Sequence, residues 1–177
     1  VVRPVRAAHL HAAWRQALSA GENAGSRAAM ALTESLAEGL PLSVLVADDN
    51  VVNQMVARMM LKRLGYTADV AANGFEVLRA IDAKPYDLIL MDVRMPEMDG
   101  YEASRRIVAQ WADRPTSRPR IIAMTGNALQ GERERCLESG MDDYMAKPFR
   151  LEELARLLLR WGPPPRRTDA EGRQGMG

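Results

Sequence analysis

The sequence predicts an α/β fold, in which five helices cover a doubly wound sheet of five parallel strands and a helical extension precedes them. Two observations support this prediction. Short apolar runs alternate with longer segments of helical character between residues 42 and 161, and such alternation is typical of parallel sheets. Polar residues also directly follow four of the apolar runs, and the carboxyl ends of parallel strands meet where α/β proteins bind ligands.

The first half of the pattern has clear boundary residues. Residues 43–47 (SVLVA) form a continuous apolar run typical of a buried parallel strand. Asn50 is a good N-cap for a helix from about Val51 to Leu64, and Gly65 suits the position after that helix. We then expect a strand at 66–71 (YTADVA), a helix from Asn73-Gly74 to about Ala83 that ends before Pro85, and a strand at 86–92 (YDLILMD).

The second half begins after the loop MPEMDG, where Asp99 can cap a helix from Gly100 to about Trp111. The segment DRPTSRP is rich in turn-forming residues and separates this helix from the next strand. The remaining elements are a strand at 120–125 (RIIAMT), a helix that begins at Asn127 and ends at Gly140, a short strand at 143–146 (DYMA), and a helix at 150–161 with apolar residues at helical spacing.

The two ends of the chain differ from this central region. Residues 2–18 align without gaps on the segment AKPFRLEELARLLLRWG, so that Arg3 matches Lys147 and Pro4 matches Pro148. We interpret residues 1–20 as the last helix of a preceding, truncated domain of the same fold, and the alternative is an ordinary amphipathic helix after a proline. Residues 21–41 are expected to be a partly helical linker, and residues 162–177 a disordered tail.

Composition excludes several classes of function. The net charge is +1 and no basic stripe is visible, which argues against nucleic-acid binding. No apolar run approaches the roughly 18 residues of a membrane-spanning helix, so we expect no membrane contact by this segment. The single cysteine, Cys136, is expected to be half-buried and inert, and it favours a reducing, cytoplasmic compartment. The first residue is valine, and we expect the chain to be a piece of a longer protein.

Four groups of polar residues follow the predicted strands: Asp48-Asp49, Asp92, Thr125 and Lys147-Pro148. Three carboxylates at one edge of a sheet would suit a hard divalent cation. A lysine and a hydroxyl beside them would suit a phosphoryl group. Each residue alone is equally compatible with a helix cap or a surface charge, so the prediction depends on their joint spacing.

Residues 42–161 resemble the receiver domains of two-component signalling. The resemblance rests on the acidic pair in DDNVVNQ, the block MDVRMPEMDGYEA, Thr125 and Lys147-Pro148. It implies a flavodoxin-like sheet with strand order 2-1-3-4-5. The motifs look most like those of receivers in hybrid sensor histidine kinases, and the repeated segment at the N-terminus is similar to their double-receiver arrangement.

This resemblance implies a role for each motif residue. Asp92 would be the phospho-acceptor, and Thr125 and Lys147 would bind the phosphoryl group. Mg²⁺ or Mn²⁺ would be held by Asp49 and Asp92 directly, by Asp48 often through water, and by the backbone carbonyl of Arg94. Tyr144 would be the aromatic switch residue, and the Lys147–Pro148 peptide would be cis.

Two further sets of residues are candidates for kinetic tuning and for docking. Arg94 and Asn127 each lie two residues after a site residue, and they could set the lifetime of the phosphoryl group. On the first helix, Val56, Met60 and Leu64 are expected to face inward. A second apolar stripe of Val52, Met55 and Met59, with Phe149 near its top, would dock the helical bundle that carries a phosphohistidine. Alternatively, the linker or the N-terminal helix covers part of this stripe.

The function implied by the resemblance is phospho-acceptance in a phosphorelay. The domain would catalyse only its own phosphorylation and dephosphorylation, as part of a bacterial hybrid histidine kinase that passes phosphate to a histidine phosphotransfer domain. A homodimer stays open. Two alternatives fit the residues less well: a haloacid-dehalogenase-like phosphatase would need an acid at position 94, where Arg94 stands, and a scaffold that works without phosphorylation would not need the complete acidic set or Lys147.

Overall fold

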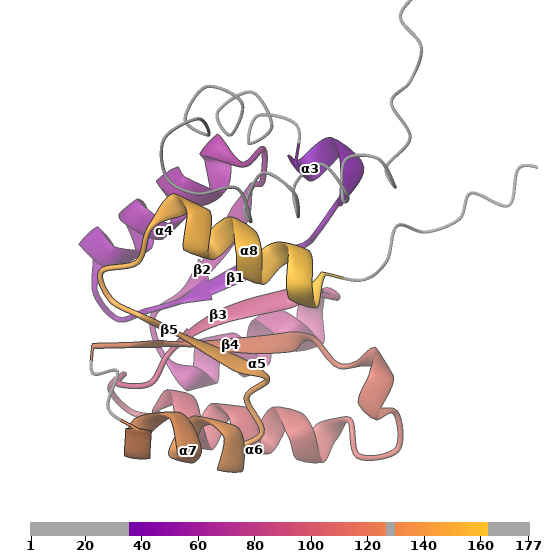
Figure 1. Cartoon of the computed structure of the whole chain (residues 1–177). Helices are drawn as coiled ribbons and strands as arrows, with labels where there is room; N and C mark the ends of the chain where they lie inside the picture. Colours follow the sequence, from indigo (N-terminus) through magenta and orange to yellow (C-terminus); the bar gives the residue numbers. More distant parts are fainter. Residues whose placement is uncertain (1–35, 127–129, 163–177) are drawn as a thin grey trace, which may run out of the picture.

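The computed structural model describes residues 36–126 and 130–162, which form a five-stranded parallel sheet with strand order β2-β1-β3-β4-β5 (Figure 1). This order confirms the predicted fold. The strands are β1 (Val44–Ala47), β2 (Ala68–Ala71), β3 (Leu88–Asp92), β4 (Arg120–Thr125) and β5 (Asp143–Ala146), and the helices are α3 (Leu36–Gly39), α4 (Val51–Arg63), α5 (Gly74–Ala83), α6 (Gly100–Gln110), α7 (Gln130–Glu138) and α8 (Leu151–Trp161), with a 3-10 turn η1 at Pro115–Ser117.

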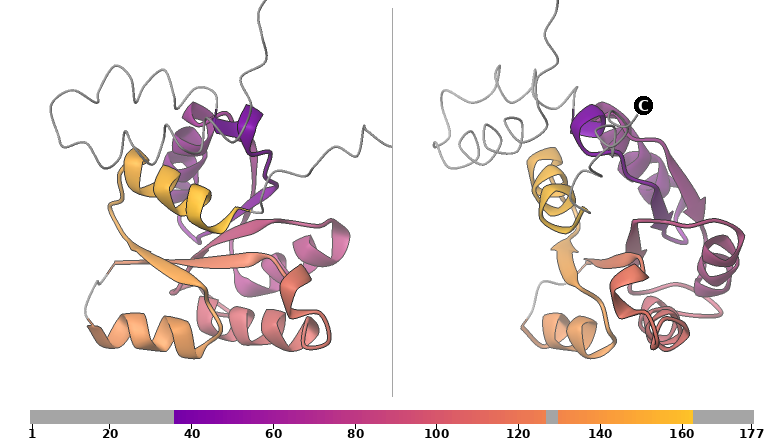
Figure 2. Two further views of the ribbon diagram at one scale, coloured as in Figure 1. Left: turned by 45° about the vertical axis from the view of Figure 1, so that its right-hand side comes forward. Right: turned by 90° about the vertical axis from the view of Figure 1, so that its right-hand side faces the viewer.

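Helices cover both faces of the sheet, and each face has its own apolar core. Val44 and Val46 of β1 point into the core beneath α3, α4 and α8. Leu45 and Ala47 point into the opposite core beneath α5, α6 and α7. Successive side chains of a strand face opposite sides, so a continuous apolar run supplies both cores at once. The views in Figures 1 and 2 show these two helical layers on either side of the sheet.

Polar side chains hold the first turns of three helices as the sequence predicts. Asn50 accepts hydrogen bonds from the backbone N–H groups of Val52 and Asn53 at the start of α4. Asn73 and Asp99 cap α5 and α6 in the same way. Gly65 has a φ of +89° after α4, in the left-handed region that favours glycine. The predicted start of the fourth helix at Asn127 lies outside the described residues, as do residues 1–35 and 163–177.

The prediction for the inward face of α4 is confirmed for Leu64 and for Met60, which packs partly buried against the core, but it was wrong for Val56. Ala57, Leu61 and Leu64 are buried, whereas Val56 is 39% exposed. Residues 57, 61 and 64 form a helical stripe of their own, and the small Ala57 lets the helix lie close to the sheet. A pattern that weighs only side-chain size assigns the inward position to the larger valine.

A short segment before the sheet also packs on the domain. Leu36 of α3 and Leu40 just after it are almost completely buried, and Leu36 joins the core beneath α4 and α8. The Tyr66 hydroxyl donates a hydrogen bond of 2.7 Å to the backbone oxygen of Leu40. Tyr66 therefore serves as an anchor, and β2 begins only at Ala68 and not at residue 66 as predicted.

Cys136 is completely buried in the core beneath α7, and not half-buried as the sequence suggests. Burial raises the pKa of its thiol, which agrees with the prediction of an inert cysteine. No helix in the described part of the chain is both long and apolar enough to span a membrane.

Candidate functional site

Strand register brings the predicted site residues together at one edge of the sheet. Ala47 of β1 is paired with Met91 of β3, so the residues that follow them, Asp48 and Asp92, emerge side by side. Thr125, the last residue of β4, is paired with Ala146 of β5, directly before Lys147. Four residues far apart in the chain thus converge because their strands end at the same level.

The three predicted carboxylates form one cluster. Oxygen atoms of Asp48, Asp49 and Asp92 all lie within 4.8 Å of one another. Asp48 is completely buried and Asp92 nearly so, whereas Asp49 is exposed to solvent. The cluster therefore combines two inner carboxylates with one at the opening of the site.

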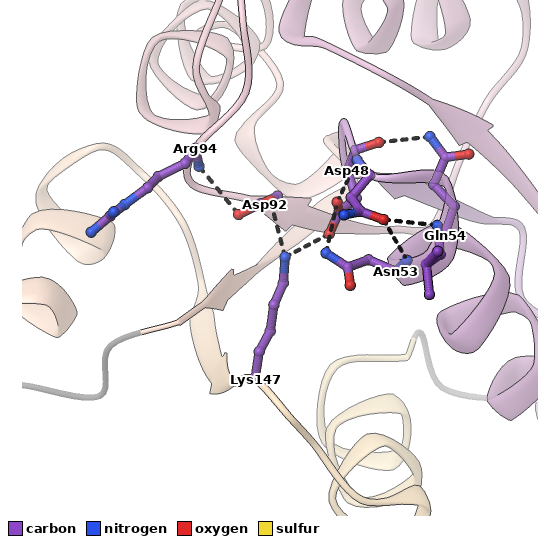
Figure 3. A network of polar contacts seen from close by, with 8 residues as sticks. Asp48, Asn53, Gln54, Asp92, Arg94 and Lys147 are labelled. Carbon is purple, nitrogen blue, oxygen red and sulfur yellow. Dashed lines mark hydrogen bonds and ion pairs between the residues drawn. The ribbon is translucent and has the colours of Figure 1, made fainter.

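Lys147 joins the two buried carboxylates. Its Nζ donates hydrogen bonds to Oδ2 of Asp48 at 2.5 Å and to Oδ2 of Asp92 at 2.9 Å (Figure 3). The lysine backbone is held in place by a 2.7 Å hydrogen bond from its N–H to the carbonyl of Thr125. The Lys147–Pro148 peptide is cis, as the resemblance implies.

Burial and hydrogen bonding have opposite effects on the pKa values of Asp92 and Lys147. Burial raises the pKa of the Asp92 carboxyl, and the hydrogen bonds from Lys147 and from the backbone N–H of Arg94 oppose this only in part. Burial would lower the pKa of the Lys147 ammonium, but its hydrogen bonds with Asp48 and Asp92 outweigh burial, and the pKa is raised. One cation among three carboxylates leaves an excess of negative charge, which favours a bound cation.

The chemistry of the donors fits a hard divalent ion. Carboxylate oxygens are the ligands that Mg²⁺ and Mn²⁺ prefer, and Mg²⁺ commonly keeps several waters and takes only one or two carboxylates from the protein. The exposed Asp49 offers such oxygens at the opening of the site, and Asp92 offers them further inside. The three clustered carboxylates could therefore hold such an ion.

Two residues of α4 belong to the site although they are not among the residues predicted from the sequence. The side-chain amide of Asn53 donates a 3.1 Å hydrogen bond to Oδ1 of Asp48, and that of Gln54 donates a 2.6 Å bond to the Asp48 backbone oxygen (Figure 3). The backbone N–H of Asn50 donates to the same Oδ1 at 2.9 Å. Both residues stand in the motif DDNVVNQ, one turn after the cap residue Asn50, but their type and spacing alone do not show which way their amides point.

Arg94 contacts the Asp92 carboxylate with its backbone rather than with its side chain. Its N–H donates a 3.2 Å hydrogen bond to Oδ1 of Asp92, while its side chain is exposed and extends away from that carboxylate (Figure 3). Arg94, Asp49 and Tyr101 line part of a cavity of about 510 Å³ beside the carboxylates. The cavity leaves room at the opening of the site for a group that approaches Asp92.

Tyr144 lies on the edge strand β5, three residues before Lys147. It is half-buried on β5 and packs against the core beneath α5, α6 and α7. The guanidinium of Arg133 on α7 lies 5.8 Å from the centre of its ring. Tyr144 is therefore part of β5, the strand that precedes Lys147, and its ring lies beside Arg133 of α7.

The predicted docking stripe is exposed. Val52, Met55 and Met59 of α4 are 66%, 61% and 58% exposed, and they lie on one side of the helix. Met55 and Met59 line a groove of about 400 Å³ between α4 and the start of β2. Phe149 is half-buried and packs against the core beneath α4 and α8.

Comparisons with known proteins agree with this geometry. Residues 44–159 match the family model described as the response regulator receiver domain. The chain is 39% identical over 141 residues to histidine kinase 5 of Arabidopsis thaliana and 38% identical over 141 residues to the sensor protein GacS of Pseudomonas syringae, matching over 67% and 77% of its own length. It spans only 15% and 16% of the length of these two relatives.

Two solved structures are similar in sequence and fold. The receiver domain of the sensor histidine kinase PA1611 from Pseudomonas aeruginosa, with a magnesium ion in its active-site cleft, is 49% identical with a TM-score of 0.61, over 68% of this chain and 96% of that one. The receiver domain of Ssk1 from Saccharomyces cerevisiae, solved with the phosphotransfer protein Ypd1, is 28% identical with a TM-score of 0.66, over 70% and 90%. The family match, the strand order and the clustered acidic residues lead to one conclusion: this chain belongs to the response regulator receiver domains of two-component signalling.

Proposed function

We propose that this receiver accepts a phosphoryl group from a phosphohistidine onto Asp92, with Mg²⁺, and thereby changes its affinity for partners. The observation that carries the proposal is the position of Lys147, whose Nζ bonds the carboxylates of both Asp48 and Asp92. A fixed cation beside the acceptor is the arrangement that phosphoryl transfer requires, because charge on the transferred oxygens must be neutralised.

The proposed transfer begins with attack by a carboxylate oxygen of Asp92 on phosphorus. The new bond joins that oxygen to phosphorus, and the bond from phosphorus to the histidine nitrogen breaks. The electron pair of the broken bond stays on the imidazole nitrogen, and the product is an acyl phosphate on Asp92. Lys147 stabilises the equatorial oxygens of the transferred group, and the Thr125 hydroxyl offers them a hydrogen bond at the end of β4.

Asp49 and Asp92, together with the backbone oxygen of Arg94, would hold the magnesium ion, and Asp48 would support it through water. The bound ion supplies positive charge to the oxygens of the phosphoryl group. The surrounding residues hold the acceptor in position. The N–H of Arg94 orients Oδ1 of Asp92, and Lys147 orients Oδ2.

The proposed donor is a helical bundle of a histidine kinase or a histidine phosphotransfer domain, and α4 would receive it. The exposed stripe of Val52, Met55 and Met59 begins directly after the site residues Asp48 and Asp49. A bundle lying on this apolar stripe would place its histidine over the acidic cluster. Relatives of this chain are hybrid histidine kinases, and the Ssk1 receiver was solved with a phosphotransfer protein, which supports this assignment.

The output of phosphorylation would be a rearrangement of the surface formed by α7, β5 and α8. Thr125 and Lys147 would move toward the phosphoryl group, and Tyr144 would follow because it lies on β5, directly before Lys147, and contacts α7. Such a change is a shift in the balance between two conformations of the domain, because the phosphoryl group on Asp92 stabilises one of them more than the other.

The test is the intact mass of the protein after incubation with acetyl phosphate, with and without Mg²⁺. We expect the unsubstituted protein to gain the mass of one phosphoryl group only when Mg²⁺ is present, and Asp92→Asn to gain none. A folded protein that binds Mg²⁺ and takes up no phosphoryl group from either acetyl phosphate or a phosphohistidine domain would contradict the proposal.

A further inference from the structure

We infer that Asn53 is a positioning residue for the magnesium site, which acts by holding the carboxylate of Asp48 in one orientation. The inference rests on the proposed function, because it assigns a part of the same site. It differs from the roles that the family resemblance implies for the metal and phosphoryl site, none of which includes Asn53.

The first step is the complete burial of Asp48. Its side chain is inaccessible to solvent, so its oxygens depend on the protein for hydrogen bonds. Oδ1 accepts from the backbone N–H of Asn50 and from Nδ2 of Asn53, and Oδ2 accepts from Nζ of Lys147. A carboxylate has about four lone-pair sites, and three of them are therefore occupied by groups from two segments of the chain.

The second step compares how constant the hydrogen bonds of these three donors to Asp48 are. The N–H of Asn50 belongs to the turn between β1 and α4 and holds Oδ1 from the backbone. Lys147 is shared with Asp92 and would be drawn toward a phosphoryl group, so its bond to Asp48 is not constant during the reaction cycle. Asn53 is then the side chain that holds Asp48 in both states, since its partner does not change.

The third step is the placement of Asn53 by α4 itself. The Asn50 side chain accepts hydrogen bonds from the N–H groups of Val52 and Asn53. Gln54, the next residue, bonds the backbone oxygen of Asp48 at 2.6 Å. The first turn of the helix is thus connected to Asp48 at its backbone and its side chain, and the amide of Asn53 is directed at Oδ1 (Figure 3).

The consequence concerns metal binding. The one acceptor position left on Asp48 faces a fixed direction only while Asn53 restrains rotation of the carboxylate. Groups that orient metal-site residues in this way typically change metal affinity by about 10-fold or more when they are removed. Asn53 is only half-buried, so its removal should change metal binding more than folding.

The experiment measures the Mg²⁺ dissociation constant of the full chain by calorimetry at pH 8 for three variants. Asn53→Leu keeps the size of the side chain and removes the donor, and we expect the dissociation constant to rise about 10-fold. Asn53→His can place its Nδ1–H where the amide nitrogen lies, and we expect it to restore most of the affinity. Gln110→Leu is the matched control, because it removes an amide–carboxylate bond of 2.8 Å to Asp82 between α5 and α6, and should bind Mg²⁺ like the unsubstituted chain.

A kinetic measurement separates positioning from a general structural role. With acetyl phosphate as donor, Asn53→Leu should need about 10-fold more Mg²⁺ for its half-maximal rate, as for binding, and should reach nearly the same maximal rate. An unchanged Mg²⁺ dependence in folded Asn53→Leu would overturn the inference, as would an equal loss in Gln110→Leu.

Nuclear magnetic resonance of the unsubstituted protein tests the same contact without any variant. The side-chain amide signals of Asn53 should show a protected, hydrogen-bonded proton before Mg²⁺ is added, and an unprotected pair of amide protons would overturn the inference.

Failure of this inference can be distinguished from failure of the proposed function. If the unsubstituted protein takes up no phosphoryl group but its Mg²⁺ affinity depends on Asn53, the inference stands and the proposed function fails.

Discussion

At the scale of single residues, the acidic cluster contains more negative than positive charge. Three carboxylates lie within 4.8 Å of one another, and Lys147 is hydrogen-bonded to two of them. Burial raises the pKa of Asp92, which means that folding disfavours its ionised form. The site therefore carries an electrostatic cost of folding that a bound cation would relieve.

This charge balance predicts the effect of Asp92→Asn on thermal stability. Without metal, the substitution removes one of the crowded charges, and we expect Tm to rise by about 4 °C, equivalent to about 1 kcal/mol in a domain of this size. Addition of Mg²⁺ should raise Tm of the unsubstituted protein and have much less effect on the variant. Calorimetric melting with EDTA or Mg²⁺ checks both expectations, with the exposed Asp113→Asn as control. A lower Tm for Asp92→Asn in EDTA would contradict this account of the site.

Gly100 allows the start of α6 to lie close to the backbone of Asp92, because it has no Cβ atom. A Cβ atom at this position would lie only 2.2 Å from the backbone oxygen of Asp92. We expect Gly100→Ala to lower the free energy of unfolding by about 1–3 kcal/mol, as overpacking does, and to slow phosphorylation by displacing the acceptor backbone. Urea unfolding and the rate of uptake from acetyl phosphate measure the two effects. Gly131→Ala is the control, since a Cβ atom added there would meet no other atom within 4 Å, and equal losses in both variants would refute the argument from close approach.

At the scale of elements, α3 extends the domain beyond its first strand. Leu40 is almost completely buried between Tyr66, whose hydroxyl bonds its carbonyl, and Gly162 after α8. The segment before β1 is therefore attached both to Tyr66, which follows α4, and to the end of α8. Figure 2 shows α3 on the same side of the sheet as α4 and α8.

The packing of this segment predicts a large effect of Leu40→Ala. A cavity in a buried leucine site costs about 2–5 kcal/mol of unfolding free energy. Leu137→Ala is the same substitution at a residue that is 44% exposed on α7, and we expect a change of about 0.5 kcal/mol or less. Urea denaturation of both variants provides the comparison. A similar small loss for both would mean that residues 36–40 do not contribute to the stability of the domain.

The elements also show which features a sequence can predict. The caps Asn50 and Asp99 were predictable because they bond backbone groups within three residues of themselves. The strands were predictable because a buried parallel strand has a continuous apolar run. The inward face of α4 and the burial of Leu36 depend on which surfaces meet after folding, and no local pattern contains that information.

The same distinction applies to the site. Asp48, Asp92 and Lys147 were predictable because acidic and basic residues at strand ends are unusual in combination. The contact of Asn53 with Asp48 was not, because an asparagine in the first turn of a helix is equally compatible with an exposed position. Its role became apparent only from the direction of its amide.

At the scale of the whole molecule, the domain has its acidic cluster at the end of the sheet and two different surfaces beside it. The α4 side is an exposed apolar stripe, and the opposite side contains Tyr144 and α7. Separate surfaces allow the donor to dock while the output surface stays free to change.

This arrangement predicts that docking and chemistry can be separated by mutation. Met55→Glu and Met59→Glu place charges on the stripe, and we expect transfer from a phosphohistidine domain to fall by about 10-fold or more, consistent with loss of an interface hot spot. Uptake from acetyl phosphate should not change. Phe75→Glu, at a 45% exposed residue of α5 on the other side of the sheet, is the control. Unchanged transfer rates in both methionine variants would exclude the α4 stripe as the docking surface.

The central claim is that Asp92 receives the phosphoryl group from a histidine. The most direct measurement is to phosphorylate the chain from a phosphohistidine domain in Mg²⁺, reduce the acyl phosphate with borohydride, and locate the modified residue by peptide mass spectrometry. Reduction converts a phosphorylated aspartate to homoserine, and we predict homoserine at position 92 alone, with none when Mg²⁺ is omitted. Homoserine at another aspartate, or aspartate at position 92 after transfer has occurred, would contradict the account.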